Sequence, residues 1–202
     1  MLQYRELTPA LLARPLTGFG LDGQSIEDLC QGGQACLLVF LPQLGSAFAR
    51  EAVQDVFNSA KNDPNYPSVV FFHHDSEDQG NLFFEKHWKR AKAVADPEMY
   101  FYREFGVPAA GLWELANPLA LARAIKAAVK GHLPKKPSSD LWSLPGTFVV
   151  SGNRILWSHN SRHAGDFPAF NKMRPLVQGL LAQDRKRPGK NSETRGKLPR
   201  AS

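Results

Sequence analysis

A buried strand that runs through a tight turn into a helix constrains the fold of this chain more than any other feature. The apolar run from Cys36 to Leu41 ends at Pro42 and Gly45. Over residues 50–60 the apolar side chains then recur at helical spacing, at Ala52, Val53, Val56, Phe57 and Ala60. The pattern predicts a strand over 36–41 and a helix whose N-terminus lies at residues 46–49.

The remaining patterns predict an α/β fold. We expect strands over 68–73, 93–95, 147–150 and 154–158, the last two joined as a hairpin, and helices over 25–29, 82–91, 98–105, 118–130 and 168–183. Polar stretches predict loops over 74–81 and 132–140. This order predicts a central mixed β-sheet flanked by helices on both faces. We expect an N-terminal extension packing on the domain over 1–34, the domain itself over 35–183, and a tail over 184–202.

Positive charge is concentrated in that tail. From Asp184 onward seven basic residues face two acidic ones, which accounts for +5 of the chain's net charge of +6. The segment holds one leucine and no aromatic residue, so it cannot bury enough apolar surface to fold. We expect a disordered basic tail, with any attraction to nucleic acid weak and confined to it.

Nothing in the sequence predicts a membrane partner. No apolar run approaches the ~18 residues that a bilayer-spanning helix needs. The first residues include Glu6 and are broken by Pro9 and Pro15, so they lack the basic-then-apolar order of a secretion signal. We therefore expect a cytoplasmic protein.

The two cysteines, Cys30 and Cys36, are six residues apart. This spacing matches neither the thiol–disulfide motif nor a zinc ribbon, and structural thiols are the favoured interpretation. The glycines between them leave open that the two thiols meet.

Histidines and charged side chains give weaker signals. His159 and His163 have the spacing of metal ligands, and His73 and His74 come at the end of a predicted strand. Because so few histidines, with no cysteine nearby, rarely form a zinc site, we expect all four to be surface residues. We predict no metal and no cofactor. In the loop after the hairpin, Arg162 and Asp166 predict a hydrogen-bonded clamp.

Arg50 falls in the first turn of the predicted helix, where a cation opposes the helix dipole. This placement predicts a partner anion, with Glu51 and Asp55 as the nearest carboxylates.

Three segments together resemble a known family: LVFLPQLGSAFARE, ADPEMYFYREFGV and LWSLPGTFVVSGNRILWSHNSRHAGDFP. Over about residues 35 to 170 the chain is similar to the peroxiredoxin-like (alkyl hydroperoxide reductase/thiol-specific antioxidant-like) branch of the thioredoxin superfamily. The resemblance implies a thioredoxin-like fold and the thiol antioxidant class.

The reactive positions of that family are changed here. Pro42, Ser46 and Ala49 fall on the family's proline, threonine and peroxidatic cysteine, and the two thioredoxin cysteines would also fall at 46 and 49. The arginine that many peroxiredoxins place before a strand of the RGTF type aligns with Pro145, which precedes Gly146 and Thr147. Compared with thioredoxins, Leu144-Pro145 fits a cis-proline, with an ordinary trans proline as the alternative.

We favour a non-catalytic module that binds a thiol, a peptide or a protein partner in a groove between Ser46 and Pro145. Its degenerate redox motif is Ser46 and Ala49, and its expected binding residues are Pro42, Gly45, Arg50, Pro145, Gly146 and Thr147. One alternative is an active thiol-dependent antioxidant oxidoreductase, which would use Cys30 and Cys36 or would derive from a parent with cysteines at 46 and 49. Another is a glutathione-binding protein that uses Ser46.

Overall fold

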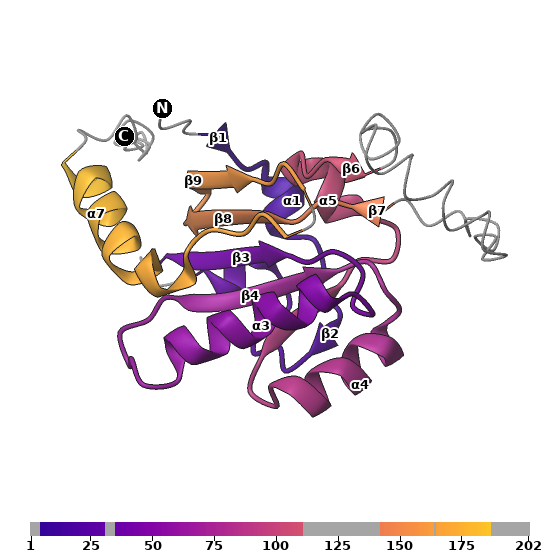
Figure 1. Cartoon of the computed structure of the whole chain (residues 1–202). Coiled ribbons are helices and arrows are strands. Elements are labelled where there is room, and N and C mark those ends of the chain that lie inside the picture. Colours follow the sequence, from indigo (N-terminus) through magenta and orange to yellow (C-terminus); the bar gives the residue numbers. More distant parts are fainter. Residues whose placement is uncertain (1–4, 31–34, 111–141, 164, 187–202) are drawn as a thin grey trace, which may run out of the picture.

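The structure is a computed structural model that describes residues 5–30, 35–110, 142–163 and 165–186. The helix predicted over 118–130 and the loop predicted over 132–140 lie outside the described residues. A seven-stranded mixed sheet forms the centre, in the order β1-β9-β8-β3-β4-β5-β2. The predicted α/β architecture, a central mixed sheet flanked by helices, is therefore confirmed (Figure 1).

Three parallel strands occupy the middle of the sheet: β3 (Cys36–Phe40), β4 (Ser68–His73) and β5 (Lys92–Ala95). The antiparallel hairpin of β8 (Gly146–Ser151) and β9 (Arg154–Asn160) joins the sheet through β3. Two short strands, β6 (Ala109–Ala110) and β7 (Trp142–Ser143), pair separately. The predicted strands over 36–41 and 68–73 and the predicted hairpin are confirmed.

Helices cover both faces of the sheet. One face packs against three short helices: α1 (Pro9–Leu12), α2 (Ile26–Leu29) and α5 (Tyr100–Phe105). The other packs against three longer ones: α3 (Ala47–Ala60), α4 (Glu77–His87) and α7 (Met173–Arg185), the last preceded by the 3-10 turn Phe170–Lys172. In Figure 1, α3 and α4 lie side by side, and α7 lies at the end of the sheet away from β6 and β7.

Strand β3 is the centre of both cores because side chains alternate across a strand. Cys36, Leu38 and Phe40 belong to the core under the short helices, whereas Leu37 and Val39 belong to the core under α3, α4 and α7. All five side chains are at most 1% exposed, so the strand is buried on both faces, as parallel strands between two helix layers are.

The segment expected as an N-terminal extension supplies both edges of the sheet. Strand β1 (Arg5–Glu6) pairs with β9, and β2 (Gly18–Phe19) pairs with β5 at the opposite edge. Residues 5–30 therefore contribute two edge strands to the sheet as well as two helices, α1 and α2, that pack on one of its faces.

Two predicted boundaries are wrong. Helix α4 begins at Glu77 instead of 82, because Ser76 and Gln79 form a capping box that turns the polar residues of the expected loop into the first helical turns. Helix α7 runs through Arg185, so the tail cannot begin at 184. The Asp184 side chain is 11% exposed and pairs with Arg154 at 2.7 Å, which anchors this last turn. Residues 187–202 lie outside the described residues.

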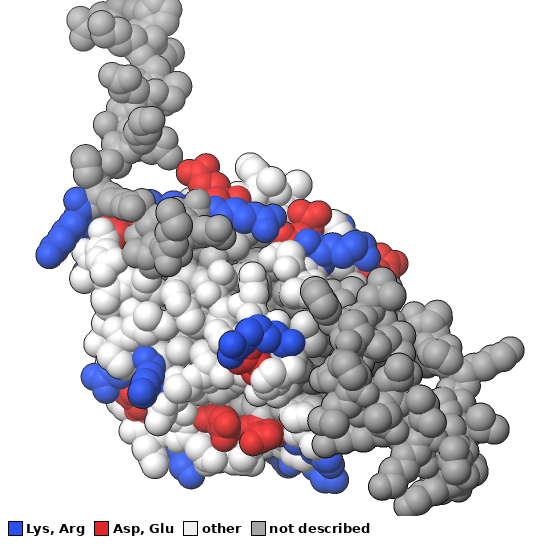
Figure 2. Space-filling view, turned by 45° about the horizontal axis from the view of Figure 1, so that its top comes forward, with Lys and Arg blue, Asp and Glu red and all other residues white. Residues whose placement is uncertain are grey.

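Charged side chains of both signs lie next to one another over the described part of the face seen in Figure 2. That part of the surface therefore presents mixed charge instead of one continuous basic patch. None of the described helices is both long and apolar enough to span a bilayer.

Candidate functional site

The turn between β3 and α3 is fixed by hydrogen bonds from three sides. Leu41 donates its amide to the carbonyl of Phe72 (2.8 Å) and accepts from the Tyr102 hydroxyl (2.6 Å). Leu44 donates its amide to a carboxylate oxygen of Asp75 (3.0 Å). Pro42 is buried in this turn, whereas Gly45 is exposed and a side chain there would meet open space. The turn is thus held rigidly at its start and open at its end.

Ser46 is the N-cap of α3, and Ala49 is the third residue of the helix. The Ser46 backbone is extended (φ −74°, ψ 154°), and its hydroxyl oxygen accepts a hydrogen bond from the Ala49 amide at 3.1 Å. The Ala49 side chain is fully buried. The prediction that positions 46 and 49 open a helix is confirmed. The serine oxygen stabilises the helix start, and the alanine carries no reactive atom.

The predicted binding residues Pro145, Gly146 and Thr147 reach the same edge of the sheet through the pairing of β8 with β3, in which Gly146 lies opposite Phe40. All three are buried. Gly146 is close-packed, since an added side-chain carbon would lie 3.1 Å from both Phe148 and Val107. These residues therefore support the edge from within instead of lining an open groove.

The expected cis-proline is wrong, because the described residues contain no cis peptide bond. The chain enters β8 directly from β7 in an extended path, and Leu144 donates its amide to the Pro108 carbonyl at 3.0 Å. Pro145 therefore lies directly before β8 as an ordinary trans proline.

The open part of this edge lies on the first turn of α3. The Phe48 side chain is 43% exposed although it is aromatic, and its ring lies against Gly165, where an added side-chain carbon would be 3.0 Å from two ring atoms. Arg50 is exposed and forms no ion pair with Glu51 or Asp55 among the described residues, so the predicted intrahelical partner is wrong. We call Gly45, Phe48, Arg50 and Gly165 the first-turn surface.

The loop beside this surface is clamped as predicted. Arg162 donates its backbone amide (2.9 Å) and its Nε (3.0 Å) to one carboxylate oxygen of Asp166. These two bonds hold the pKa of Asp166 at about 2, so the carboxylate stays charged. The other carboxylate oxygen lies 3.3 Å from Nε2 of His159. The clamp therefore fixes the loop that packs against Phe48.

His73 is a buried residue at this edge that sequence reasoning placed on the surface. It ends β4, is 0% exposed, and neither ring nitrogen has a hydrogen-bond partner among the described residues. Gly80 of α4 lies against the ring so closely that a side chain there would overlap it. Burial lowers the pKa of His73 to about 4, so the ring is neutral at pH 7. The signal that could have found it is its alternation with the buried Phe71 in β4.

Asp96 and Tyr102, also missed, connect β5 to the turn. The Asp96 carboxylate accepts backbone hydrogen bonds from Tyr100 (2.8 Å), Phe101 (2.8 Å) and Tyr102 (3.2 Å) at the start of α5. Burial raises the pKa of Asp96, and these three bonds oppose that rise. The anchored helix aims the Tyr102 hydroxyl at the carbonyls of Leu41 and Phe72.

The described residues contain no group of three or more His, Cys, Asp or Glu side chains that could hold a metal ion.

Cys30 and Cys36 lie at the other end of β3. Both are free thiols and buried, and their side chains are in hydrogen-bonding contact with each other. Cys36 begins β3 and donates its thiol to the Leu29 carbonyl at 2.8 Å, whereas Cys30 ends α2. The structure therefore brings together the two cysteines whose meeting the sequence left open.

Several solved structures have a similar arrangement. A mutant of PrxQ from Xylella fastidiosa is 15% identical over 89% of this chain and 95% of its own, with a TM-score of 0.61. Reduced Prx3 from Vibrio vulnificus is 11% identical over 89% of this chain and 98% of its own (TM-score 0.59). A thiol:disulfide interchange protein DsbE from Chlorobium tepidum is 14% identical over 83% of this chain and 94% of its own (TM-score 0.51). These likenesses show a thioredoxin-like fold.

A search among curated proteins gave no match. A family model described as AhpC/TSA antioxidant enzyme matches residues 45–163, a stretch that begins at the turn before α3 and ends after the β8–β9 hairpin. Because this match spans more than half of the sequence and includes the helix start built above, the chain belongs to the AhpC/TSA antioxidant enzyme family.

Proposed function

We propose that this chain is a family member without peroxidase chemistry at the start of α3, and that it uses the first-turn surface to bind a small thiol or an extended peptide. The observation that carries the proposal is Ala49. By the resemblance to peroxiredoxins it takes the place of the family's peroxidatic cysteine, and in the structure its side chain is fully buried at the third position of α3.

Peroxide reduction needs a thiolate that a helix N-terminus or a nearby cation stabilises. Ser46 and Ala49 provide no sulfur, and a serine hydroxyl is a weak nucleophile whose oxygen here already caps the helix. Pro145 adds no charge where the family often has an arginine. The Ser46 cap and the hydrogen bond from Tyr102 to the turn hold this region rigid. This rigidity favours a binding surface over a reactive centre.

The first-turn surface combines features that bind an extended anionic ligand. At the start of α3 the Ser46 amide donates to Gln43 and the Ala49 amide to Ser46, which leaves the amides of Ala47 and Phe48 for a ligand. Arg50 adds a positive charge, and the exposed Phe48 ring adds apolar contact area. A carboxylate-bearing peptide or a small peptide thiol matches this combination of charge, amides and ring.

The catalytic half of the proposal is tested by stopped-flow consumption of hydrogen peroxide with excess dithiothreitol. We expect no turnover above that of the reductant alone, both for the full chain and for the Cys30→Ser/Cys36→Ser variant. Saturable turnover that persists in the double variant would overturn the proposal, because it would require chemistry at the start of α3.

The binding half is tested by NMR titration of amide signals with reduced glutathione. We expect shifts centred on Ala47 and Phe48 that Phe48→Asp abolishes. Leu82→Asp is the matched control, since Leu82 is also an exposed apolar residue on a helix of the same face, at 74% exposure. Equal titrations of the two variants would exclude the first-turn surface as the binding site.

The same titration separates the glutathione-binding alternative. If the Ser46 hydroxyl donates to a bound thiolate, Ser46→Ala weakens binding of reduced glutathione but leaves binding of S-methylglutathione unchanged. If the surface instead binds the carboxylates and backbone of the ligand, as proposed, the two ligands bind with equal affinity. Arg50→Gln then lowers the affinity for both.

A further inference from the structure

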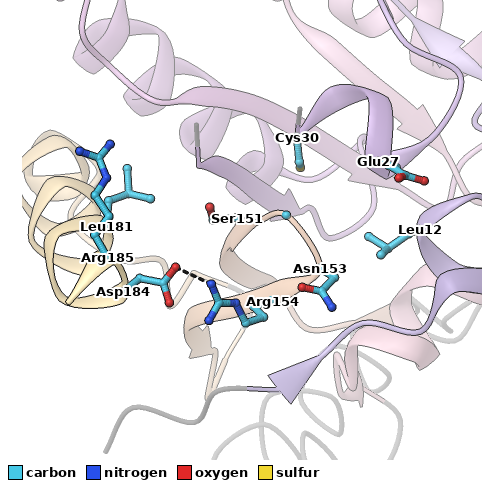
Figure 3. A pocket seen from close by; sticks show the side chains of 10 residues that line it. Leu12, Glu27, Cys30, Ser151, Asn153, Arg154, Leu181, Asp184 and Arg185 are labelled. Atoms are coloured by element: carbon cyan, nitrogen blue, oxygen red, sulfur yellow. Dashed lines mark hydrogen bonds and ion pairs between the residues drawn. The ribbon is translucent and has the colours of Figure 1, made fainter. Parts of the chain in front are cut away.

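A pocket lies beside the two thiols at the amino end of β3. Cys30 lines a pocket of about 570 Å³ formed where α7 and α2 face each other across the turn of the β8–β9 hairpin (Figure 3). Leu12 and Leu181 supply apolar wall, and Ser151 and Asn153 come from the hairpin turn. Cys36 does not line the pocket and is 1% exposed, so Cys30 is the thiol of the pair that a ligand in the pocket can contact.

The charged lining of this pocket is balanced. Arg154 and Arg185 are matched by Glu27 and Asp184, and Arg154 is paired with Asp184 at 2.7 Å, as the dashed line in Figure 3 shows. A pocket that offers both signs of charge favours a ligand that carries both carboxylate and ammonium groups. Its volume falls within the range of ~300 to 1,000 Å³ that is usual for small-molecule sites.

We propose that Cys30 and Cys36 are an exchange-active dithiol that reduces a small zwitterionic peptide disulfide bound in this pocket. Three observations carry the proposal: the contact of the two thiols, with Cys36 bonded to the carbonyl of Leu29 next to Cys30, the position of Cys30 on the pocket wall, and the mixed charge of the lining. The proposal goes beyond the binding function proposed above and concerns the opposite end of β3.

The reaction runs in two displacements. Cys30 loses its proton and attacks one sulfur of the disulfide. The ligand's S–S bond breaks, a mixed disulfide forms on Cys30, and the first ligand thiolate leaves with that proton. Cys36, deprotonated, then attacks the Cys30 sulfur, which forms the Cys30–Cys36 disulfide and expels the second ligand thiolate, and this takes up the proton from Cys36. Two protein thiols are oxidised and one ligand disulfide is reduced to two thiols.

The structure suits each thiol to its step. Cys30 meets the ligand first because it faces the pocket. Cys36 is suited to the second step because the hydrogen bond from Cys30 lowers the pKa of Cys36, and Lys92 and Ser68 act in the same direction. The hydrogen bond with Cys36 and burial raise the pKa of Cys30, so Cys30 must give up its proton as the ligand binds.

The direct test incubates the reduced full chain with oxidised glutathione and follows intact mass. We expect the wild-type chain to lose two hydrogen atoms and to release two molecules of reduced glutathione. Cys36→Ser should stop at one glutathionyl group on Cys30, and Cys30→Ser should remain unmodified. A wild-type chain that stays reduced unless denaturant is added would overturn the proposal, and so would a Cys30→Ser variant that is glutathionylated as fast as Cys36→Ser.

A second test addresses recognition by the pocket. Arg185→Gln should slow the reaction with oxidised glutathione about threefold, the size expected for one exposed charge. Lys86→Gln, which removes an equivalent exposed charge on α4, should not. The uncharged probe 2-hydroxyethyl disulfide should react equally with both variants. Equal rates for Arg185→Gln and Lys86→Gln with oxidised glutathione would show that the pocket charges do not select the ligand and would overturn that part of the proposal.

The variant Phe48→Asp keeps the two proposals distinguishable. It removes the first-turn surface but leaves the cysteine pocket intact, so thiol oxidation should proceed at the wild-type rate. If the dithiol fails to exchange while the first-turn surface still binds glutathione, only the exchange proposal is lost, and the reverse result removes only the binding proposal.

Discussion

At its carboxyl end, β3 leads into a helix N-terminus whose turn is held by Tyr102 and Asp75 but which carries no thiol. At its amino end, two thiols touch each other at the end of the short helix α2. The first region has a helix N-terminus, which can stabilise a thiolate, but neither Ser46 nor Ala49 carries sulfur. The second has the sulfurs, and its ionised form depends on the neighbouring thiol instead of on a long helix.

This contrast shows that scaffold and reactive atom are separable. The hydrogen bonds that fix the turn are made by backbone atoms, Tyr102 and Asp75, none of which depends on a sulfur at 46 or 49. These bonds therefore hold the turn in place with Ser46 and Ala49 at the helix start. Cys30 and Cys36 can lie in contact at the amino end of β3, because contact between two cysteines requires only that the segments carrying them pack together.

The largest expected effect comes from restoring the thiols at the carboxyl end. In a Cys30→Ser/Cys36→Ser background, Ser46→Cys with Ala49→Cys should form a disulfide under mild oxidant, because residues three apart in a first helical turn lie within bonding distance. The thiol at position 46 should titrate below the ~8.5 of a free cysteine. Its reaction with hydrogen peroxide should exceed background on the order of a hundredfold.

Thiolate absorbance against pH and stopped-flow peroxide consumption measure these outcomes, and Arg50→Ala added to the variant should raise the thiol pKa again. Ser46→Cys alone is the control for a single thiol. A double-cysteine variant that stays reduced, or titrates like a free thiol, would show that the carboxyl end has lost the electrostatics as well as the sulfur.

The pH dependence of the free energy of unfolding tests whether His73, at the carboxyl end of β4, is packed as a core residue. His73 has a folded-state pKa of about 4, below the ~6.5 of an unfolded chain, so the unfolded state binds the proton first as the pH falls. The contribution of His73 to the free energy of unfolding is therefore complete above pH ~6.5. As the pH falls to about 4, about 3 kcal/mol of it is lost.

Urea unfolding near neutral pH and at about pH 4 measures this loss. His73→Leu should remove most of it, whereas His163→Leu, at an exposed position, should leave it unchanged. An undiminished loss of stability in His73→Leu would mean that other groups carry the acid sensitivity.

Two tyrosine hydroxyls, that of the buried Tyr102 and that of the half-buried Tyr66, allow the two ends of the sheet to be compared. Tyr102 donates toward Leu41 and Phe72 at the carboxyl end, and Tyr66, just before β4, donates to Phe170 at 2.9 Å. Tyr102→Phe should lower the free energy of unfolding by about 1 to 2 kcal/mol, because it removes the hydroxyl that donates to the buried Leu41 carbonyl. Tyr66→Phe should cost about 0.5 to 1 kcal/mol.

Chemical denaturation gives both values, and hydrogen exchange locates them. Faster exchange at the amides of Leu41 and Leu44 is expected in Tyr102→Phe only. Similar exchange patterns in the two variants would show that the turn does not depend on Tyr102.

The smallest effect concerns the wall of the cysteine pocket. A double-mutant cycle of Arg154→Gln and Asp184→Asn should give a coupling energy of up to about 1 kcal/mol that decreases with added salt, as partly exposed ion pairs do. A coupling of zero would mean that α7 is held against the hairpin by apolar contacts alone.

Sequence by itself determined the elements whose signals are local. The helical spacing after Gly45 predicted α3, and Ser46 was correctly placed at its start. The apolar runs predicted β3 and β4, and Ser151-Gly152-Asn153 predicted the hairpin between β8 and β9. These succeed because hydrophobic periodicity and turn chemistry act between near neighbours in the chain. Where a local signal was ambiguous, as in the polar first turns of α4, the prediction was wrong.

Only the tertiary structure decided which distant residues meet. Sequence spacing could not tell whether Cys30 and Cys36 touch, because that depends on how α2 packs against the first residue of β3. The burial of His73 depends on the close approach of Gly80 in α4, and the sequence left open whether the bond before Pro145 is cis or trans. Such contacts follow from the strand order of the sheet and from the packing of its two helix layers, which no local pattern in the sequence encodes.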